Sequence, residues 1–596
     1  MLTSLSVAFA AETADSTLSV KNLQQGDIVK FYKVLEENMD ATGDNANVVG
    51  AGGWSVTTKF ASALDTAKIK TILGIDVVAP AVGGISETVA GDIAKLATGD
   101  GYLQASAGSD GIATVNSGVT TGLYVAVITP AKAGMIYNPV FVGADYNGTN
   151  NTNEWLISLD PTYSPASMAK KDTITLKKEA YDPTSNDADH QGTVRVGDTV
   201  NFTVKTRIPE FADNYTKAIF NLTDTLSTGL TLNQNSIHVY VANVDGDNWT
   251  KGSEIVPTAG DDKTFTIPAA NLSAGGYKIV FDKDYLLSLS AAQPIIVEYN
   301  AVVTSQALTS VNLEDNTVEL NYSNSPDDET GKGKLKDETK HYTFDIDAEV
   351  TGQGSWDAFE VVKVGLDANG KEITEVTNVH TGTRPIGALA GAEFALYTDQ
   401  ACTQRYENTY YGANDVIVSG ADGRLFVKDS GKEGIRGLDA GVYYLKETKA
   451  PDGYIKQQDE VKIEIKTVME SVHYSETTTD GILVEWDVDE LKSYSIEING
   501  VPTASYTFTN ASDEVTHYGD VTDKASQGDT VIGSDGKIGD EGNHPGAGYG
   551  KIVNTKGVEL PSTGGMGTTI LYVGGSILVL AAVILLITKR RMNAED

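Results

Sequence analysis

Short segments in which apolar and polar residues alternate recur along most of the chain. They lie at residues 26–34, 123–128, 173–178, 318–324, 359–364 and 442–447. A two-residue period places alternate side chains on opposite faces and is typical of half-buried strands. Residues 60–97 have a weaker periodicity that favours a helix. The pattern predicts an all-β protein with a helical insertion in its first part.

One continuous apolar segment near the end of the chain differs from these alternating segments. It runs without a charge from Thr569 to Thr588 and is followed by Lys589, Arg590 and Arg591. Roughly 20 residues form a helix of about 30 Å, long enough to cross the hydrocarbon core of a bilayer. Because a basic cluster favours the cytoplasmic side, we expect residues 1–568 to lie outside the membrane.

Breaks in the strand pattern indicate several domains. Pro161 and Pro165 exclude a central strand at 160–171, and residues 325–339 are charged and rich in turn formers. Residues 511–550 are rich in Gly and Asp and predict a spacer. We expect five segments, at 1–11, 12–160, 161–335, 336–558 with a spacer near 511–550, and 559–596.

The N-terminal segment has the composition of a signal-peptide remnant. Leu2 to Ala11 are apolar and small, and Ala8-Phe9-Ala10 is a plausible signal-peptidase site. The first lysine is Lys21, so the basic region that normally precedes such a segment is missing. We interpret residues 1–11 as the residual part of an export signal.

Charge and cysteine content narrow the class of function. The net charge of −36 makes nucleic acid a poor partner, because phosphate binding needs a basic surface. Cys402 is the one cysteine, so no intrachain disulfide can stabilise an exported chain. The chain has no HExxH, CxxC, GxGxxG or P-loop motif, and residues 245–248 lack the spacing of an EF-hand loop. We expect no enzyme activity, no cofactor and no metal site.

Lysines within apolar strands are the unusual feature. Lys178 is in phase with Ile174 and Leu176, and Lys363 is in phase with Phe359 and Val361. A lysine on a buried face costs free energy unless it is neutral or paired, although at a strand end it can extend toward solvent. Two strands carry an asparagine in the same phase as their apolar residues, ending at Asn324 and at Asn510.

Three motifs resemble those of sortase-assembled pilins of Gram-positive bacteria. Leu560-Pro561-Ser562-Thr563-Gly564, before the apolar segment, is similar to the LPxTG sorting signal. Residues 444–454 match the pilin E-box, Tyr-Leu-x-Glu-Thr-x-Ala-Pro-x-Gly-Tyr. Residues 221–230 resemble the strand and turn that carry an aspartate in this family. The resemblance implies tandem Ig-like β-sandwich domains of the CnaA and CnaB types, followed by a transmembrane helix.

The resemblance also implies intramolecular amide (isopeptide) bonds between lysine and asparagine, promoted by a buried acid. Burial would leave the amine neutral and the acid protonated, which suits attack on the carboxamide. The implied set at 161–335 is Lys178, Asp224 and Asn324, with Lys177 as a weaker rival of Lys178. The implied set at 336–558 is Lys363, Glu447 and Asn554, with Asn510 as the alternative to Asn554.

The sorting signal implies a reaction between subunits. In the family, a sortase cleaves after the threonine, here Thr563, and transfers the acyl group to a lysine of the next subunit. The usual Tyr-Pro-Lys context of that lysine is missing here, although Trp155 is present. We assign Lys171 as the acceptor and Lys170 as the alternative. A solvated pair of linker lysines is the simpler interpretation of the same residues.

The resemblance therefore implies a backbone pilin subunit that is secreted, polymerised and anchored to the cell wall. The partners it implies are pilin-specific and housekeeping sortases, further copies of the chain, minor pilins, peptidoglycan and a possible host surface ligand. The alternative is a minor pilin or a monomeric wall-anchored adhesin. An adhesin would need no acceptor lysine at the junction.

Overall fold

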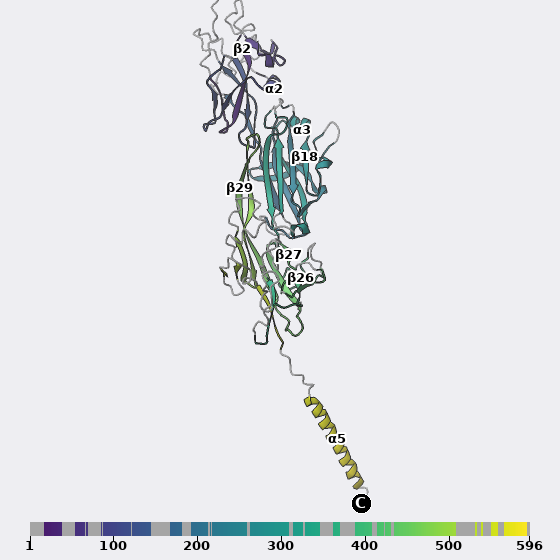
Figure 1. Ribbon diagram of the computed structural model, residues 1–596. Coiled ribbons are helices and arrows are strands. Elements are labelled where there is room, and N and C mark those ends of the chain that lie inside the picture. The colour runs from purple at the N-terminus through teal and green to yellow at the C-terminus, as the bar shows by residue number, and fades with distance from the viewer. Residues whose placement is uncertain are drawn as a thin grey trace, which may run out of the picture.

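The computed structural model is an elongated row of β domains with one helix at its C-terminal end (Figure 1). It describes the following residues: 17–37, 54–65, 67–69, 85, 87–120, 122–144, 167–181, 192–211, 215, 217–258, 263–308, 314–325, 328–345, 361–369, 388–407, 414–421, 423–430, 434–507, 531–532, 538–539, 550–557 and 566–592. The prediction of an all-β fold with an apolar C-terminal helix is confirmed. The signal remnant, Trp155, Asn510 and the sorting motif at 560–564 lie outside the described residues.

The first domain packs a helix against a mainly antiparallel sheet. The sheet has the order β3 (Trp54–Val56), β2 (Ile28–Glu37), β6 (Gly122–Thr129), β8 (Val140–Ala144), and β4 (Tyr102–Ser106) also pairs with β2. Helix α2 (Glu87–Leu96) contributes Ile93 to one buried cluster, which fits the helical periodicity of the sequence. The short 3-10 helix η1 (Thr58–Phe60) contributes Phe60 to the same cluster.

The segment that leads out of this domain is held by short strand pairs. One small sheet has the order β5 (Ala113–Val115), β1 (Leu18–Lys21), β9 (Ser167–Met168). A second pair joins β7 (Met135–Tyr137) to β10 (Lys171–Thr173). The predicted strand at 173–178 is thus two strands, because β10 pairs with the first domain and β11 (Leu176–Tyr181) with the second.

The second domain is a sandwich of two sheets. One has the order β11, β12 (Thr199–Ile208), β19 (Gln293–Val303), β15 (His238–Asp245), β16 (Asn248–Glu254), with β14 (Leu230–Leu232) also on β19. The other has the order β17 (Phe265–Thr266), β18 (Gly276–Phe281), β13 (Phe220–Leu226), β20 (Glu314–Tyr322), β21 (Gly333–His341). The short helices α3 (Lys283–Ser288), η3 (Gln234–Ser236), η4 (Ala269–Asn271) and η5 (Ser305–Leu308) connect these strands.

The expectation that residues 325–339 interrupt the strand pattern as a charged, turn-rich segment is wrong for its second half, because Gly333–His341 form β21. This strand pairs with β20 over nine residues, from Tyr322–Gly333 to Glu314–His341. Its charged side chains are not all solvated, since Glu338 and Lys340 are buried. Lys340 contacts Glu490 and Glu338 accepts from Trp486, both on a strand of another domain, and the sequence pattern of β21 alone cannot reveal these partners.

The third domain is built on a seven-stranded sheet. Its order is β26 (Leu425–Val427), β25 (Ile417–Ser419), β24 (Glu393–Tyr397), β28 (Gly441–Lys449), β29 (Val461–Thr477), β30 (Leu483–Ile498), β31 (Val501–Thr507). Three two-stranded pairs accompany it: β23 (Val361–Leu366) with β34 (Gly550–Thr555), β22 (Phe344–Asp345) with β27 (Arg436–Leu438), and β32 (Val531–Ile532) with β33 (Ile538–Gly539).

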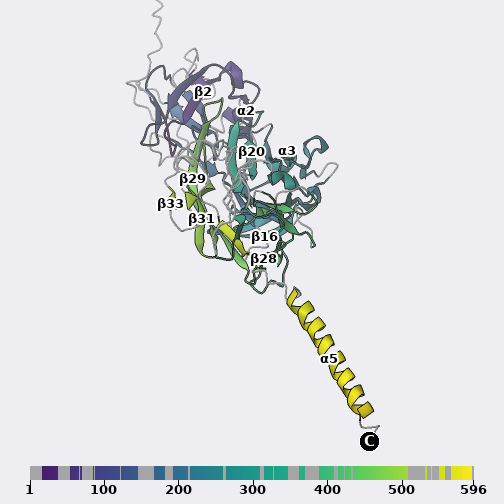
Figure 2. The ribbon, with the colours of Figure 1, turned by 60° about the horizontal axis from the view of Figure 1, so that its bottom comes forward.

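The β29–β30 hairpin is much longer than the domain that carries it. A register shift between Val468 and Met469 separates its inner half from its outer half, of which Val472 and Leu491 still pack in the core of the third domain. This half runs along β21 of the second domain and reaches the first, where Leu483 exchanges backbone hydrogen bonds with Ala131 and Ala133. Two views show β29 beside the second domain and pointing toward the first (Figures 1 and 2).

The helix α5 (Met566–Met592) follows the last domain (Figure 1). Its segment from Leu571 to Arg591 has a mean hydropathy of 2.5 and packs against no other described part of the protein. By length and composition it can cross a membrane, as the sequence predicted.

Candidate functional site

In the second domain, the amine of Lys178 crosses from one sheet to the other. Lys178 lies on β11, and its Nζ is 2.6 Å from Oδ2 of Asp224 on β13 and 2.6 Å from Oδ1 of Asn316 on β20. Asp224 pairs with Val318, two residues from Asn316, so the two side chains are diagonal neighbours on one face. The rings of Phe202 and Tyr299 lie beneath the amine, with centroids 5.5 and 5.4 Å away.

Burial shifts the pKa values of Lys178 and Asp224. The side chains of Lys178 and Asp224 have no exposed surface. Removal from water lowers the pKa of the Lys178 amine and raises the pKa of the Asp224 carboxyl, although their mutual attraction opposes both shifts. The Tyr299 hydroxyl donates to Asp224 Oδ2 at 2.7 Å and accepts from Asn316 Nδ2 at 2.9 Å. The acid is therefore connected both to the nucleophile and to the carboxamide nitrogen.

The asparagine in this site is Asn316, and the assignment of Asn324 is wrong. Both residues have the same phase as the apolar residues of the strand, so alternation alone does not distinguish them. Asp224 lies opposite Val318, and Asn324 is six residues beyond Val318 in the direction away from Asn316. At about 3.4 Å per residue, that is about 20 Å along the strand, which is too far for a lysine side chain. Asn324 is buried elsewhere, and its backbone N–H donates to Asp328.

In the third domain, Lys363 and Asn554 lie on neighbouring parallel strands. In the pairing of β23 with β34, Lys363 is opposite Ile552 and Gly365 is opposite Asn554. Lys363 Nζ donates to the Ile552 carbonyl at 2.8 Å, two residues before Asn554 on the same strand. The structure therefore brings Lys363 close to Asn554, whereas the alternative, Asn510, lies outside the described residues.

The acid of the third domain contacts the asparagine. Asn554 Nδ2 donates to Glu447 Oε2 at 2.9 Å and to the Ile455 carbonyl at 2.8 Å. Glu447, Asn554 and Lys363 are all buried. Burial lowers the pKa of the Lys363 amine to about 7, an effect that the nearby Glu447 partly opposes. A large share of this amine is therefore neutral at physiological pH.

The segment after the E-box strand fixes this arrangement. Ile455 N–H donates to the Thr555 carbonyl at 2.9 Å, and Gly557 N–H donates to the Gly453 carbonyl at 2.8 Å. Gly453 has a φ of +84°, a conformation that glycine adopts without strain. The E-box residues therefore form a turn that holds β34, and Asn554 with it, against Glu447.

The two junction lysines are exposed at the base of the first domain. Lys171 is the first residue of β10, where it pairs with Tyr137, and the Lys170 carbonyl accepts from Asn138 N–H at 3.0 Å. Asn22 donates through its side chain to the Ala169 carbonyl at 2.8 Å. The backbone around both lysines is thus held by the first domain while their side chains face solvent.

Sequence reasoning missed two members of the second-domain site, Asn316 and Tyr299. Asn316 could have been found, because it has the same phase as Val318, Leu320 and Tyr322 on one strand. Tyr299 gave no such signal, since one tyrosine on a strand is ordinary. Its role depends on the register between β12 and β19, which places it opposite Phe202.

Comparisons with known proteins agree with the motifs. Residues 361–479 match the SpaA family, described as a prealbumin-like fold domain, and residues 552–594 match the LPXTG cell wall anchor motif. The "Trypsin-resistant surface T6 protein" of Streptococcus pyogenes serotype M6 is 24% identical over 591 residues, covering 96% of this chain and 94% of that protein.

The fold is similar to that of solved pilins. The T6 backbone pilin of serotype M6 Streptococcus pyogenes, described as a modular three-domain structure, superposes with a TM-score of 0.51 at 19% identity, covering 92% of this chain and 100% of the other. The full-length major pilin SpaD from Corynebacterium diphtheriae gives a TM-score of 0.42 at 16% identity, covering 92% and 99%.

The anchor motif and the apolar helix α5 support a cell wall-anchored surface protein with a membrane-bound precursor. The prealbumin-like SpaA domain, the anchor motif and the similarity to the T6 protein together support a sortase-assembled pilin of the Gram-positive type.

Proposed function

We propose that this chain is the backbone subunit of a cell-wall fimbria, and that two intramolecular Lys–Asn amides stabilise it. The observation that carries the proposal is the buried contact of Lys178 Nζ with both Asp224 and Asn316. An amine, a carboxyl and a carboxamide, all buried and in contact in one core, are the groups that such a condensation needs. The same three residue types recur at Lys363, Glu447 and Asn554.

The condensation at Lys178 balances with loss of ammonia. The neutral Nζ attacks Cγ of Asn316, so that an Nζ–Cγ bond forms and the Cγ–Nδ2 bond breaks. Protonated Asp224 polarises the carboxamide, accepts a proton from Nζ and returns one to Nδ2, which leaves as NH3. Tyr299 lies between Asp224 and Nδ2 and gives the proton a path. At Lys363 the acid already contacts the leaving nitrogen, because Asn554 Nδ2 donates to Glu447.

Polymerisation joins one subunit to the next. In this proposal a sortase forms an acyl-enzyme at Thr563, releasing Gly564 onward together with α5. The Lys171 amine of the next subunit then resolves it, with Lys170 as the alternative. Both lysines are exposed on a segment that backbone hydrogen bonds hold to the first domain, which suits an acceptor. The protein is then the substrate of sortases and not a turnover catalyst.

The test of polymerisation is co-expression with the cognate pilin sortase, followed by denaturing electrophoresis. The wild-type chain should give a ladder of covalent multimers, and replacing both Lys170 and Lys171 by Ala should abolish it. Lys177→Ala is the matched control, since Lys177 is an exposed lysine six residues away. A ladder from the Lys170/Lys171 double variant would refute the lysine assignment. A single anchored species from the wild type would favour a monomeric adhesin instead.

A further inference from the structure

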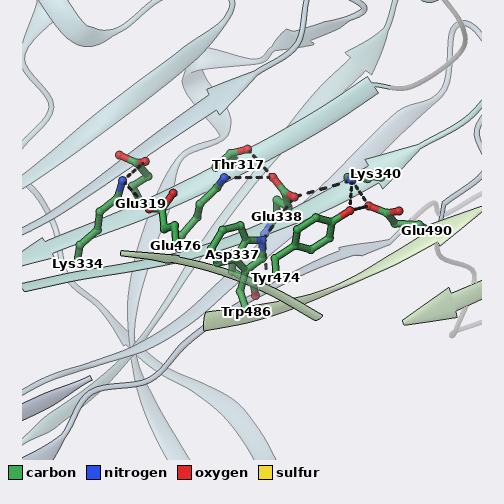
Figure 3. A network of polar contacts seen from close by, with 11 residues as sticks. Thr317, Glu319, Lys334, Asp337, Glu338, Lys340, Tyr474, Glu476, Trp486 and Glu490 are labelled. Carbon is green, nitrogen blue, oxygen red and sulfur yellow. Dashed lines mark hydrogen bonds and ion pairs between the residues drawn. The ribbon is translucent and has the colours of Figure 1, made fainter. Parts of the chain in front are cut away.

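A third buried lysine lies outside both candidate sites, where the second and third domains meet. Lys340 is near the end of β21, and its Nζ contacts Oε1 of Glu490 on β30. Neither side chain has exposed surface. Figure 3 shows the lysine reaching from one strand to the glutamate of the other domain. This pair has no role in the Lys–Asn chemistry and none in the sortase reaction.

The surroundings of Lys340 share several features with the Lys178 site. The amine lies 5.1 Å from the ring centroid of Tyr474, and the Tyr474 hydroxyl contacts the same Glu490 oxygen. A second carboxyl is near, since Glu338 Oε1 is 4.0 Å from Lys340 Nζ. Each site thus has a buried amine over a tyrosine ring, a carbonyl carbon within reach and a further acid.

Polar contacts fix the second carboxyl. Trp486 Nε1 donates to Glu338 Oε1 at 3.5 Å, and Thr317 donates to Glu338 Oε2 at 3.2 Å. The Trp486 ring stacks on Tyr474 with centroids 5.7 Å apart, so the hairpin side chains cover the site (Figure 3). Glu490 Oε2, in contrast, is buried without a hydrogen-bond partner among the described residues.

An ion pair is a poor resting state in this place. A buried pair repays its loss of hydration only when further hydrogen bonds satisfy both groups, and Glu490 Oε2 lacks one. Condensation removes the two ionisable groups and leaves a neutral amide in the core.

We propose that Lys340 and Glu490 condense to an interdomain amide that joins the second domain to the hairpin of the third. In the reaction one proton passes from Nζ to an oxygen of Glu490, Nζ attacks Cδ, an Nζ–Cδ bond forms, and the bond between Cδ and the protonated oxygen breaks. Glu338 accepts the proton from Nζ and donates it to the departing hydroxyl, which leaves as water. The product needs no oxidant or cofactor. This inference goes beyond the proposed function and does not rest on it.

The test is peptide mapping of the full-length chain, expressed without a sortase and purified in detergent. We expect one branched peptide that joins Lys340 to Glu490, lighter by about 18 Da than its two linear components, since water is lost. The Lys–Asn amides lose ammonia, about 17 Da each, so the two kinds of cross-link are scored separately. Quantitative recovery of linear peptides with free Lys340 and Glu490 would overturn the proposal.

The same digest contains an internal control. Lys334 and Glu476 join the same strand and the same hairpin, with Nζ 3.2 Å from Oε1, but both are partly exposed. Water hydrates this pair, so we expect it to remain ionic and its peptides to stay linear. Cross-linking of Lys334 at the same yield would show non-specific chemistry and would also overturn the proposal.

Two variants separate the chemistry from folding. Lys340→Met combined with Glu490→Leu keeps the volume without burying a lone charge, and it should lose the branched peptide while keeping both Lys–Asn peptides. Glu338→Gln keeps the Lys340–Glu490 contact but removes the acid, and its cross-link yield should fall at least tenfold at a fixed time. An unchanged yield would refute the role of Glu338.

Discussion

The two candidate Lys–Asn sites differ in what they connect. Asn554 lies on β34, the last strand that the structure describes in the third domain, and Lys363 lies on β23, which only the two-residue strand β22 precedes there, so an amide would span most of that domain. Lys178 lies on the first strand of the second domain, but Asn316 lies on β20, and β21 follows it. In the second domain, strand β21 therefore lies outside the segment that the proposed amide would close.

This difference suggests that the β29–β30 hairpin transmits tension between the second and third domains. With the proposed amide in place, tension that enters at Lys178 would pass to Asn316 through covalent bonds, but it would reach β21 only through the ladder with β20. Lys340 is on this strand and contacts Glu490 of the next domain. An interdomain amide at this point would let the load pass from β21 directly into the third domain.

The largest expected effect is that of removing the nucleophile of the second domain. Lys178→Met prevents the cross-link and fills the volume of the lysine side chain, while the Asp224 carboxyl keeps its hydrogen bond from Tyr299. The amide closes a loop of 138 residues, so its loss should reduce the free energy of unfolding of this domain by about 5 kcal/mol. Denaturant unfolding of the full chain would measure this effect. Lys177→Met is the control, because Lys177 is exposed, and a loss of equal size in that variant would contradict the assignment.

A second expected effect is kinetic and separates the acids of the two sites. Glu447→Gln keeps a hydrogen-bond acceptor near Asn554 but removes the transferable proton, so cross-linking in the third domain should slow by about 100-fold or more. The second domain, which depends on Asp224, should react at its normal rate. Time-resolved peptide mapping after refolding would compare the two. Equal slowing of both sites would show that the variant acts through folding and not through chemistry.

A third expected effect is a pH dependence that appears when the third domain cannot cross-link. In Asn554→Ala the Lys363 amine stays free, with a folded-state pKa of about 7 against an ordinary value near 10.5. Between these values the unfolded chain binds the extra proton, so stability should rise with pH by up to about 1.4 kcal/mol per unit and level off above pH 10.

The control for this pH effect removes the lysine as well. In the double variant Lys363→Met and Asn554→Ala, the slope that belongs to Lys363 should vanish, and the difference between the two variants isolates it. A flat difference from pH 7 to 10 would mean that the amine is not held in a dry environment.

The smallest expected effect is that of Asn324→Ala. Because Asn324 is remote from Lys178, this variant should keep the cross-link of the second domain and lose only about 1 kcal/mol or less of stability. Asn316→Ala should abolish the cross-link. Peptide mapping of both variants checks the comparison, and loss of the amide in the Asn324 variant would restore the original assignment.

These sites show what a sequence pattern can and cannot specify. Alternation predicts that the side chains of Lys178 and Lys363, and the asparagines in phase with apolar residues, lie on buried faces, since the period of a strand is a local property. It does not give the register between strands, so it cannot distinguish Asn316 from Asn324. The pairing of Lys340 could not be predicted at all, because its partner Glu490 is 150 residues away in the sequence, on a hairpin of another domain. In a sequence, charged residues whose partners lie in another domain have the same pattern as a solvated linker.

The most direct test of the account is mass spectrometry of the branched peptide from the second domain of the wild-type chain. We expect a peptide that joins Lys178 to Asn316 and is lighter by about 17 Da than its linear components, through loss of ammonia. Recovery of both residues in linear peptides, with the Asn316 carboxamide intact, would contradict it.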